Sequence, residues 1–138
     1  MANYYANSRT NYFRVTNEDK YNELFSNLVG DEDTVQDFTK TVDGVTLHGF
    51  GCYGSVNYKK ENDTDYDFDF FLNELQKILP DNEVFIYIEN GHEKLCYLTG
   101  FSIIVSKDKI ESVDIISDSI EKAREMLCNS KYHTDMNY

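Results

Sequence analysis

Three stretches of the chain repeat apolar residues at intervals of three and four, the spacing of an amphipathic helix. The apolar positions are Tyr21, Leu24, Phe25 and Leu28; Phe68, Phe71, Leu72, Leu75 and Leu79; and Ile120, Ala123, Met126 and Leu127. The residues expected to cap or end these helices are Asn17 with Gly30, Asp65 or Asp67 with Pro80, and Ser117 or Asp118. The pattern predicts three helices, each with one face in the core.

Stretches rich in β-branched and aromatic residues predict strands at residues 10–15, 35–41, 45–58, 84–89, 94–105 and 110–115. Asp43-Gly44 and Asn90-Gly91 favour tight hairpin turns, because both dipeptides tolerate positive φ angles. The expected order is β-α-β-β-α-β-β-β-α. It predicts an α+β fold with a mostly antiparallel sheet of about five to six strands and the helices on one face.

The length of 138 residues predicts a single domain, with residues 129–138 as a loosely held tail. No apolar run approaches the roughly 18 residues of a membrane span, and the start lacks the pattern of a signal peptide. Cys52, Cys96 and Cys128 are an odd number at wide spacing, which favours buried, reduced thiols. We therefore expect a cytoplasmic protein.

The net charge of −12 comes from 25 acidic and 13 basic residues. Such a surface repels nucleic acid and phospholipid and favours a basic protein partner, although a solubility role explains the same charge. Residues 61–93 hold ten acids and one lysine. The predicted partner-binding acids are Glu61, Asp63, Asp65, Asp67, Asp69, Asp81, Glu83, Glu89 and Glu93. Their carboxylates would stand in for phosphates opposite Lys and Arg.

Two motifs have the spacing of a binding site but the wrong local structure. Gly49, Gly51 and Gly54 match G-x-G-x-x-G, yet a strand pattern follows where a dinucleotide site needs a helix. The glycines are better explained as sites where a strand bends. The pairs His48 with Cys52 and His92 with Cys96 lie in strands, where four residues span about 13 Å, too far for two ligands of one zinc ion.

The aspartates from Asp63 to Asp69 also resemble a calcium loop, with Glu74 at its twelfth position. The sixth position, which needs glycine, is Phe68. We therefore expect neither a metal nor another cofactor. No Ser, Cys or Thr stands in a nucleophile context and the three histidines are scattered, so we expect no catalytic residues.

Residues 1–15, the segment HGFGCYGSV at 48–56 and the segment NGHEKLCYLTGFSIIVSKDKIESVDI at 90–115 carry a family resemblance. The chain resembles small proteins of phages and conjugative elements of Gram-positive bacteria, which include anti-CRISPR inhibitors of type II-A Cas9. The resemblance implies a non-enzymatic inhibitor whose acidic surface binds Cas9 or another host nuclease. Two alternatives remain: an antirestriction-type DNA mimic, and a small-ligand or calcium-binding accessory domain.

Overall fold

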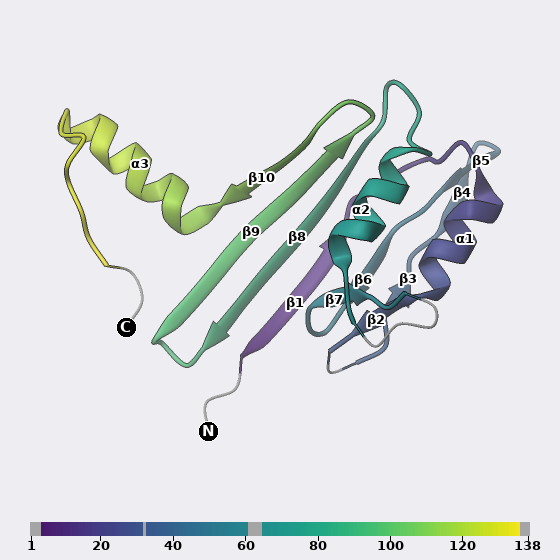
Figure 1. The fold of residues 1–138 in the computed structure, drawn as a ribbon, viewed down its shortest axis with the longest axis horizontal. Coiled ribbons are helices and arrows are strands. Elements are labelled where there is room, and N and C mark those ends of the chain that lie inside the picture. Colours follow the sequence, from purple (N-terminus) through teal and green to yellow (C-terminus); the bar gives the residue numbers. More distant parts are fainter. Residues whose placement is uncertain (1–3, 32, 61–64, 136–138) are drawn as a thin grey trace.

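The computed structural model describes residues 4–31, 33–60 and 65–135. Its centre is a six-stranded antiparallel sheet in the order β10-β9-β8-β1-β6-β3 (Figure 1). The strands are β1 (Tyr5–Thr10), β3 (Gln36–Asp37), β6 (Phe50–Cys52), β8 (Val84–Glu93), β9 (Tyr97–Ser106) and β10 (Ile110–Asp114). This arrangement confirms the predicted α+β fold with a mostly antiparallel sheet.

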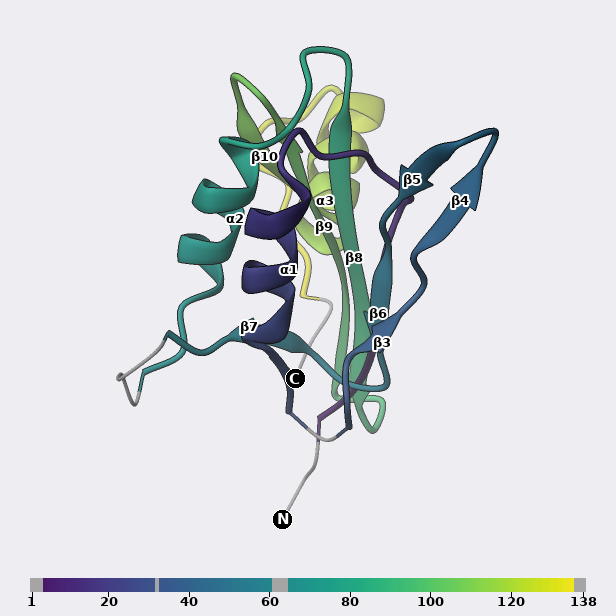
Figure 2. The same ribbon diagram turned by 90° about the vertical axis from the view of Figure 1, so that its right-hand side faces the viewer.

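Four short strands form two further pairs. β2 (Leu28–Gly30) pairs with β7 (Val56–Tyr58), and β4 (Lys40–Val42) pairs with β5 (Val45–Leu47). The predicted turn between β4 and β5 is confirmed, with φ angles of 52° at Asp43 and 78° at Gly44. The β4–β5 hairpin projects from the side of the sheet opposite helices α1 and α2 (Figure 2).

Helices α1 (Glu18–Ser26) and α2 (Phe68–Gln76) cover one face of the sheet, and α3 (Ile115–Leu127) extends beyond β10 (Figures 1 and 2). Two predicted caps are confirmed. Asn17 Oδ1 accepts a hydrogen bond from the Lys20 amide at 3.0 Å, and Asp67 Oδ1 accepts one from the Phe70 amide at 3.0 Å. None of the helices in the described ranges has the length and apolar character needed to span a membrane.

The core lies between α1, α2 and the sheet. Its centre is a group of fully buried aromatic rings, Phe13, Phe50, Phe71 and Phe85. Phe85 meets Phe13 and Phe71 edge-on, with ring centroids 5.1 and 6.2 Å apart. Burying one such side chain stabilises the fold by about 1.5–3 kcal/mol, so this cluster fixes the helices on the sheet.

The first predicted strand, at residues 10–15, is wrong in position. β1 ends at Thr10, and Phe13 instead forms an isolated bridge with His48. The predicted strand at 45–58 is divided because its segments change partners: β5 pairs with β4, β6 with β1 and β3, and β7 with β2. A side chain at Gly51 would lie 2.9 Å from the Ser8 carbonyl, so glycine permits this close pairing.

The predicted end of the first helix at Gly30 is also wrong. α1 is closed by Asn27, and Leu28 has left the helix to pair with Tyr58 in the β2–β7 sheet. Leu28 is nevertheless buried in the core. Leu28 therefore contributes to the core as predicted, but from a strand and not from a helix. Gly30 is needed for a different reason, because a Cβ at this position would collide with the Asp33 carbonyl.

The turn predicted at Asn90-Gly91 does not exist, because β8 runs through both residues. The hairpin closes instead between Glu93 and Tyr97, with Lys94 at a φ of 51°. Gly91 serves close packing, since a side chain at this position would collide with the phenol of Tyr4.

The last helix begins earlier than predicted, at a cap formed by Asp114 in place of Ser117 or Asp118. Asp114 Oδ1 accepts from the Ile116 and Ser117 amides at 3.0 Å, and Asp118 accepts from the Asp114 amide at 2.9 Å. The predicted inward face is wrong for Met126 and Leu127, which are 79% and 58% exposed, whereas Ile120 and Ala123 are half-buried. After the helix, residues 129–135 form no helix or strand, and Arg124 Nε donates to the Tyr132 carbonyl at 2.8 Å.

The three cysteines are free thiols, but only one of them is buried as expected. Cys52 lies in the core, Cys96 is half-buried and Cys128 is exposed. Burial raises the pKa of the Cys52 thiol. The expectation of three buried thiols is therefore wrong for Cys128.

Candidate functional site

The face of the sheet opposite α1 and α2 forms a grid of cross-strand neighbours that neither helix covers. Register places these residues in three rows, because directly paired residues of neighbouring strands point to the same side. The rows are Tyr5, His92 and Leu98; Asn7, Asn90 and Gly100; and Arg9, Ile88 and Ser102. We call these nine residues, together with Tyr53, which follows β6 and lines the same hollows, the open face.

The open face differs from the rest of this acidic chain in its charge. Strands β1, β3, β6, β8 and β9, all of which the structure describes, carry no carboxylate on this side. Arg9 is the charged residue of the open face and lies in its last row, and the first strand carboxylate on the same side is Glu111 on β10. Carboxylates therefore lie beside this surface, with Glu111 and Asp118 at its β10–α3 edge, but not on these strands.

Three adjoining hollows follow the open face, with volumes of about 300, 560 and 510 Å³. Asn90 lines all three, and Asn7 and Tyr53 line the first two. The third hollow is bounded by Ile115 and the first turns of α3. The surface is consequently a continuous series of shallow depressions with an amide at its centre.

Two cations at one end of this surface lie over aromatic rings. The Arg9 guanidinium is 5.3 Å from the centroid of Phe38, and Lys40 Nζ is 3.9 Å from that of Tyr12. Both contacts are favourable and hold the side chains close to the surface. The end of the face beside the β4–β5 hairpin is therefore mildly basic and aromatic.

Large apolar and aromatic side chains on this face are strongly exposed. The exposed fractions are 51% for Tyr5, 67% for Tyr53, 50% for Ile88 and 48% for Leu98. Aromatic residues and Arg are enriched at the cores of protein interfaces, where Asp, Glu and Lys are depleted. Neighbouring amides such as Asn90 can donate and accept hydrogen bonds to a partner backbone. This chemistry suits the recognition of another protein.

One predicted surface acid, Glu89, is buried and cannot contact a partner. Its side chain lies on the covered side of the sheet with 6% exposure. The carboxylate accepts from the Tyr87, Ser55 and Tyr4 hydroxyls at 2.7, 2.9 and 3.1 Å. These three donors compensate for its burial. Because burial disfavours the phenolate, the pKa of Tyr87 is raised. The assignment of Glu89 to the acidic surface is wrong.

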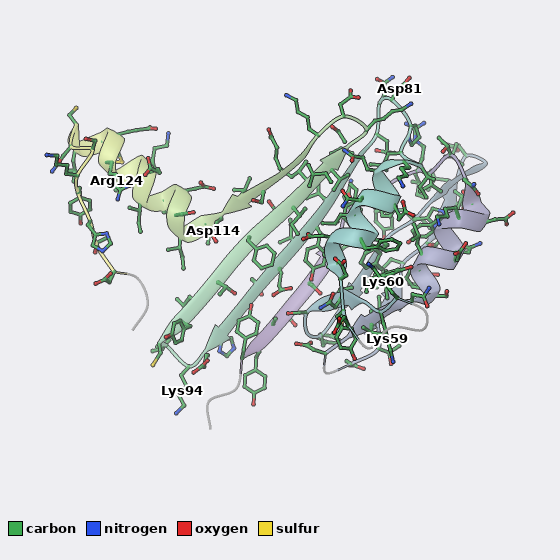
Figure 3. All side chains as sticks on the ribbon, in the orientation of Figure 1. Lys59, Lys60, Asp81, Lys94, Asp114 and Arg124 are labelled. Atoms are coloured by element: carbon green, nitrogen blue, oxygen red, sulfur yellow. The ribbon has the colours of Figure 1, made fainter. Side chains whose placement is uncertain are left out.

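The other predicted acids do not gather on one surface. Asp65, Asp67 and Asp69 lie at the start of α2, whereas Asp81 and Glu83 follow its far end. Glu93 lies at the opposite end of the sheet, beside Lys94, and Figure 3 shows how far Lys94 is from Asp81. Glu61 and Asp63 lie outside the described residues.

Several of these acids already have cationic partners within the protein. Asp67 lies 3.4 Å from Lys60, Asp81 lies 2.8 Å from Lys107, and Glu83 lies 3.0 Å from Arg14. The hydrogen bond from the Phe70 amide lowers the pKa of Asp67, and the hydrogen bond from Lys107 lowers that of Asp81. A partner cation would have to compete with these contacts.

The histidines do not form a catalytic centre with acids in any of these hollows. His48 is buried, and its Nε2 lies 2.6 Å from Glu18 and its Nδ1 3.2 Å from Thr39. None of the open-face hollows is lined by His48, whereas His92 lines one without a carboxylate. Across the described residues, no group of three or more His, Cys, Asp or Glu could hold a metal ion.

No protein-family model, curated protein or solved structure matches this chain. The assignment of the site therefore depends on its own geometry and chemistry.

The sequence contained one signal for the open face that the search for acids missed. In β8, apolar residues occupy both sets of alternate positions: Phe85 and Tyr87 are buried, whereas Ile86 and Ile88 point to the other side. A strand of a sheet covered on one face normally alternates apolar with polar residues. The second apolar set at these positions indicates a surface that meets something else.

Proposed function

We propose that this protein is a non-enzymatic inhibitor of a host defence nuclease, with Cas9 as the first candidate, acting in the bacterial cytoplasm. The observation that carries the proposal is the open face, an uncovered surface of aromatic, aliphatic and amide side chains without carboxylates on β1, β6, β8 and β9, all strands that the structure describes. The net charge of −12 supports a basic partner.

In this proposal the acids and the open face have different roles. The acids around the sheet attract the basic nucleic-acid-binding surface of a nuclease over long range and accelerate association. The open face then forms the contact, with Tyr5, Tyr53 and Ile88 entering the partner and Asn90 bonding to its backbone. The alternative mechanism, in which a row of carboxylates mimics the phosphates of a nucleic acid, has less support. Glu89 is buried, and Asp81 and Glu83 already form ion pairs with Lys107 and Arg14.

The proposal is tested with purified type II-A Cas9, guide RNA and a target DNA. Wild-type protein should bind Cas9 in a pull-down and inhibit cleavage. The variant Tyr53→Ala with Ile88→Ser should lose both activities, because it removes the exposed anchors of the open face. The absence of binding and of inhibition by the wild-type protein at micromolar concentration would overturn the assignment to Cas9.

A matched variant on the other side of the molecule distinguishes direct binding by the open face from long-range electrostatic attraction by the acidic residues. Asp65→Asn with Asp69→Asn removes two exposed carboxylates near α2. This pair should slow association and weaken its salt dependence while inhibition persists. Inhibition that survives the open-face substitutions but disappears with the acidic pair would show that the open face is not the site.

A further inference from the structure

β10 ends the six-stranded sheet and has a neighbour on one side only among the described strands. All five of its residues are exposed, including Ile110 at 39% and Val113 at 46%. An exposed edge strand presents unpaired N–H and C=O groups and is a template for strand addition. Helices α1 and α2 lie over the other part of the sheet, so they do not cover this edge (Figure 1).

The register identifies which backbone groups point outward. The Ser106 amide donates to the Lys109 carbonyl at 2.8 Å, and the antiparallel register continues from this pair. Since bonds form at every second pair, Glu111 and Val113 bond to β9, while Ile110 and Ser112 direct their backbone groups away from the sheet. The Asp114 amide, next in the outward set, donates to Asp118 instead. The open part of the edge is thus centred near Ser112.

Helix α3 has an apolar stripe that the described chain covers only in part. Ile116, Ile120 and Ala123 are half-buried, whereas Leu127, at the same helical spacing, is 58% exposed, and no residue of α3 is fully buried. The helix extends past β10, away from the body of the sheet (Figure 1). A 13-residue amphipathic helix normally places such a stripe against another element.

We propose that a second copy of this chain covers both features. The β10 strands of two copies pair antiparallel, with Ser112 at the twofold axis, and join the two sheets into one. α3 of each copy then lies against the β9–β10 end of the other. Such a contact is isologous, because the same surface of both copies forms it.

The absence of like-charge contacts favours this register. It places Ser112 opposite Ser112, Glu111 opposite Val113 and Ile110 opposite Asp114, with no like charges in contact. A shift to the register centred one residue earlier would place Glu111 opposite Glu111, which is destabilising. The proposed pairing also brings Lys109 of the second copy to the start of α3, beside Asp118. The inference does not depend on the identity of a nuclease partner.

Sedimentation equilibrium of the full chain, from micromolar to near-millimolar concentration, tests the dimer. Wild-type protein should form a reversible dimer. Ser112→Pro removes an outward amide without removing a bond to β9, so it should preserve the circular dichroism spectrum and weaken dimerisation about tenfold. Ser112→Thr keeps the amide and is the control. A wild-type monomer throughout, or a folded Ser112→Pro variant that dimerises normally, would overturn the proposal.

Cross-linking tests the register even if the proline variant fails to fold. In a chain whose Cys96 and Cys128 are replaced by serine, Ser112→Cys should give a disulfide-linked dimer on mild oxidation. Directly opposite residues with exchanged bonds have Cα atoms about 5.5 Å apart, within the range of a disulfide. Glu111→Cys, the control, should remain monomeric on non-reducing denaturing gel electrophoresis. Failure of Ser112→Cys to cross-link, or equal cross-linking at both positions, would contradict this arrangement.

Discussion

The two sides of the central sheet use the same strands for different purposes. On the covered side, Phe85 and Tyr87 of β8 are 0% and 2% exposed and pack under α1 and α2. On the other side, Ile88 of the same strand is 50% exposed. Since side chains alternate along a strand, neighbouring positions can serve folding and recognition independently. This separation predicts that substitutions on one side change stability and those on the other change binding.

The largest loss of stability is expected from Phe85→Ala on the covered side. Phe85 is fully buried and contacts the rings of Phe13, Phe50 and Phe71. Its removal should lower the free energy of unfolding by about 3–5 kcal/mol, measured by urea denaturation. Ile88→Ala, on the open face, is the matched control and should cost no more than about 1 kcal/mol. Equal losses would contradict the distinction between the two sides.

A smaller loss is expected from Glu89→Leu, which deprives the Tyr4, Ser55 and Tyr87 hydroxyls of their shared acceptor. The free energy of unfolding should fall by about 2–3 kcal/mol, because buried donors left unpaired are costly. Glu93→Leu alters a half-buried acid further along the same side of β8 and should change stability by about 0.5 kcal/mol or less. If Glu89→Leu were neutral in thermal unfolding, the buried cluster would have no stabilising role.

The pH dependence of folding stability tests the ion pairs of Glu74, which lies where α1 and α2 meet on the covered side of the sheet. Glu74 lies 2.5 Å from Lys77 and 3.8 Å from Lys20 of α1, and the hydrogen bond from Lys77 holds its pKa below the usual 4.5. A lowered folded-state pKa stabilises the protein above pH 4.5, and this contribution disappears as the pH falls through the folded-state pKa.

Glu74→Gln should therefore cost about 0.5 kcal/mol at pH 7 and almost nothing at the acid end of the titration, as measured by urea denaturation at each pH. Asn73→Asp, at the exposed neighbouring position, is the control for added charge on α2. A difference between wild type and Glu74→Gln that grew on acidification would contradict the role of Lys77 and Lys20.

The smallest change in stability is expected from Tyr53→Ser on the open face. Its side chain is 67% exposed, so the free energy of unfolding should change by about 0.5 kcal/mol or less. The same substitution should weaken partner binding by about 2 kcal/mol, measured by calorimetric titration, because exposed aromatic residues are frequent interface hot spots. Loss of stability together with unchanged binding would reverse the roles assigned to the two sides.

Some local signals in the sequence predicted the local structure, whereas others failed. Asn17 and Asp67 cap helices, and Asp43-Gly44 forms a turn, because each effect depends on a few neighbouring residues. Asn90-Gly91 failed because Tyr4, from the start of the chain, packs over Gly91. A dipeptide cannot report such a distant contact.

The candidate site was predicted poorly for the same reason. The burial of Glu89 depends on hydroxyls from Tyr4 and Ser55, which sequence charge does not reveal. The open face is assembled from β1, β8 and β9, whose register is fixed only in the folded sheet. Counting acidic residues therefore located the negative charge but missed the open face.

The position of β1 has a consequence for how the chain folds. β1 precedes the other described strands along the chain but lies inside the sheet between β6 and β8, and Tyr4 and Glu89 are 85 positions apart. Such non-local pairing slows folding, because a long loop must close before the contacts form. On the ribosome, the N-terminal strand must remain unpaired on one side until β8 has emerged. During that interval the unpaired edge of β1 is open to pairing with other chains, which favours aggregation.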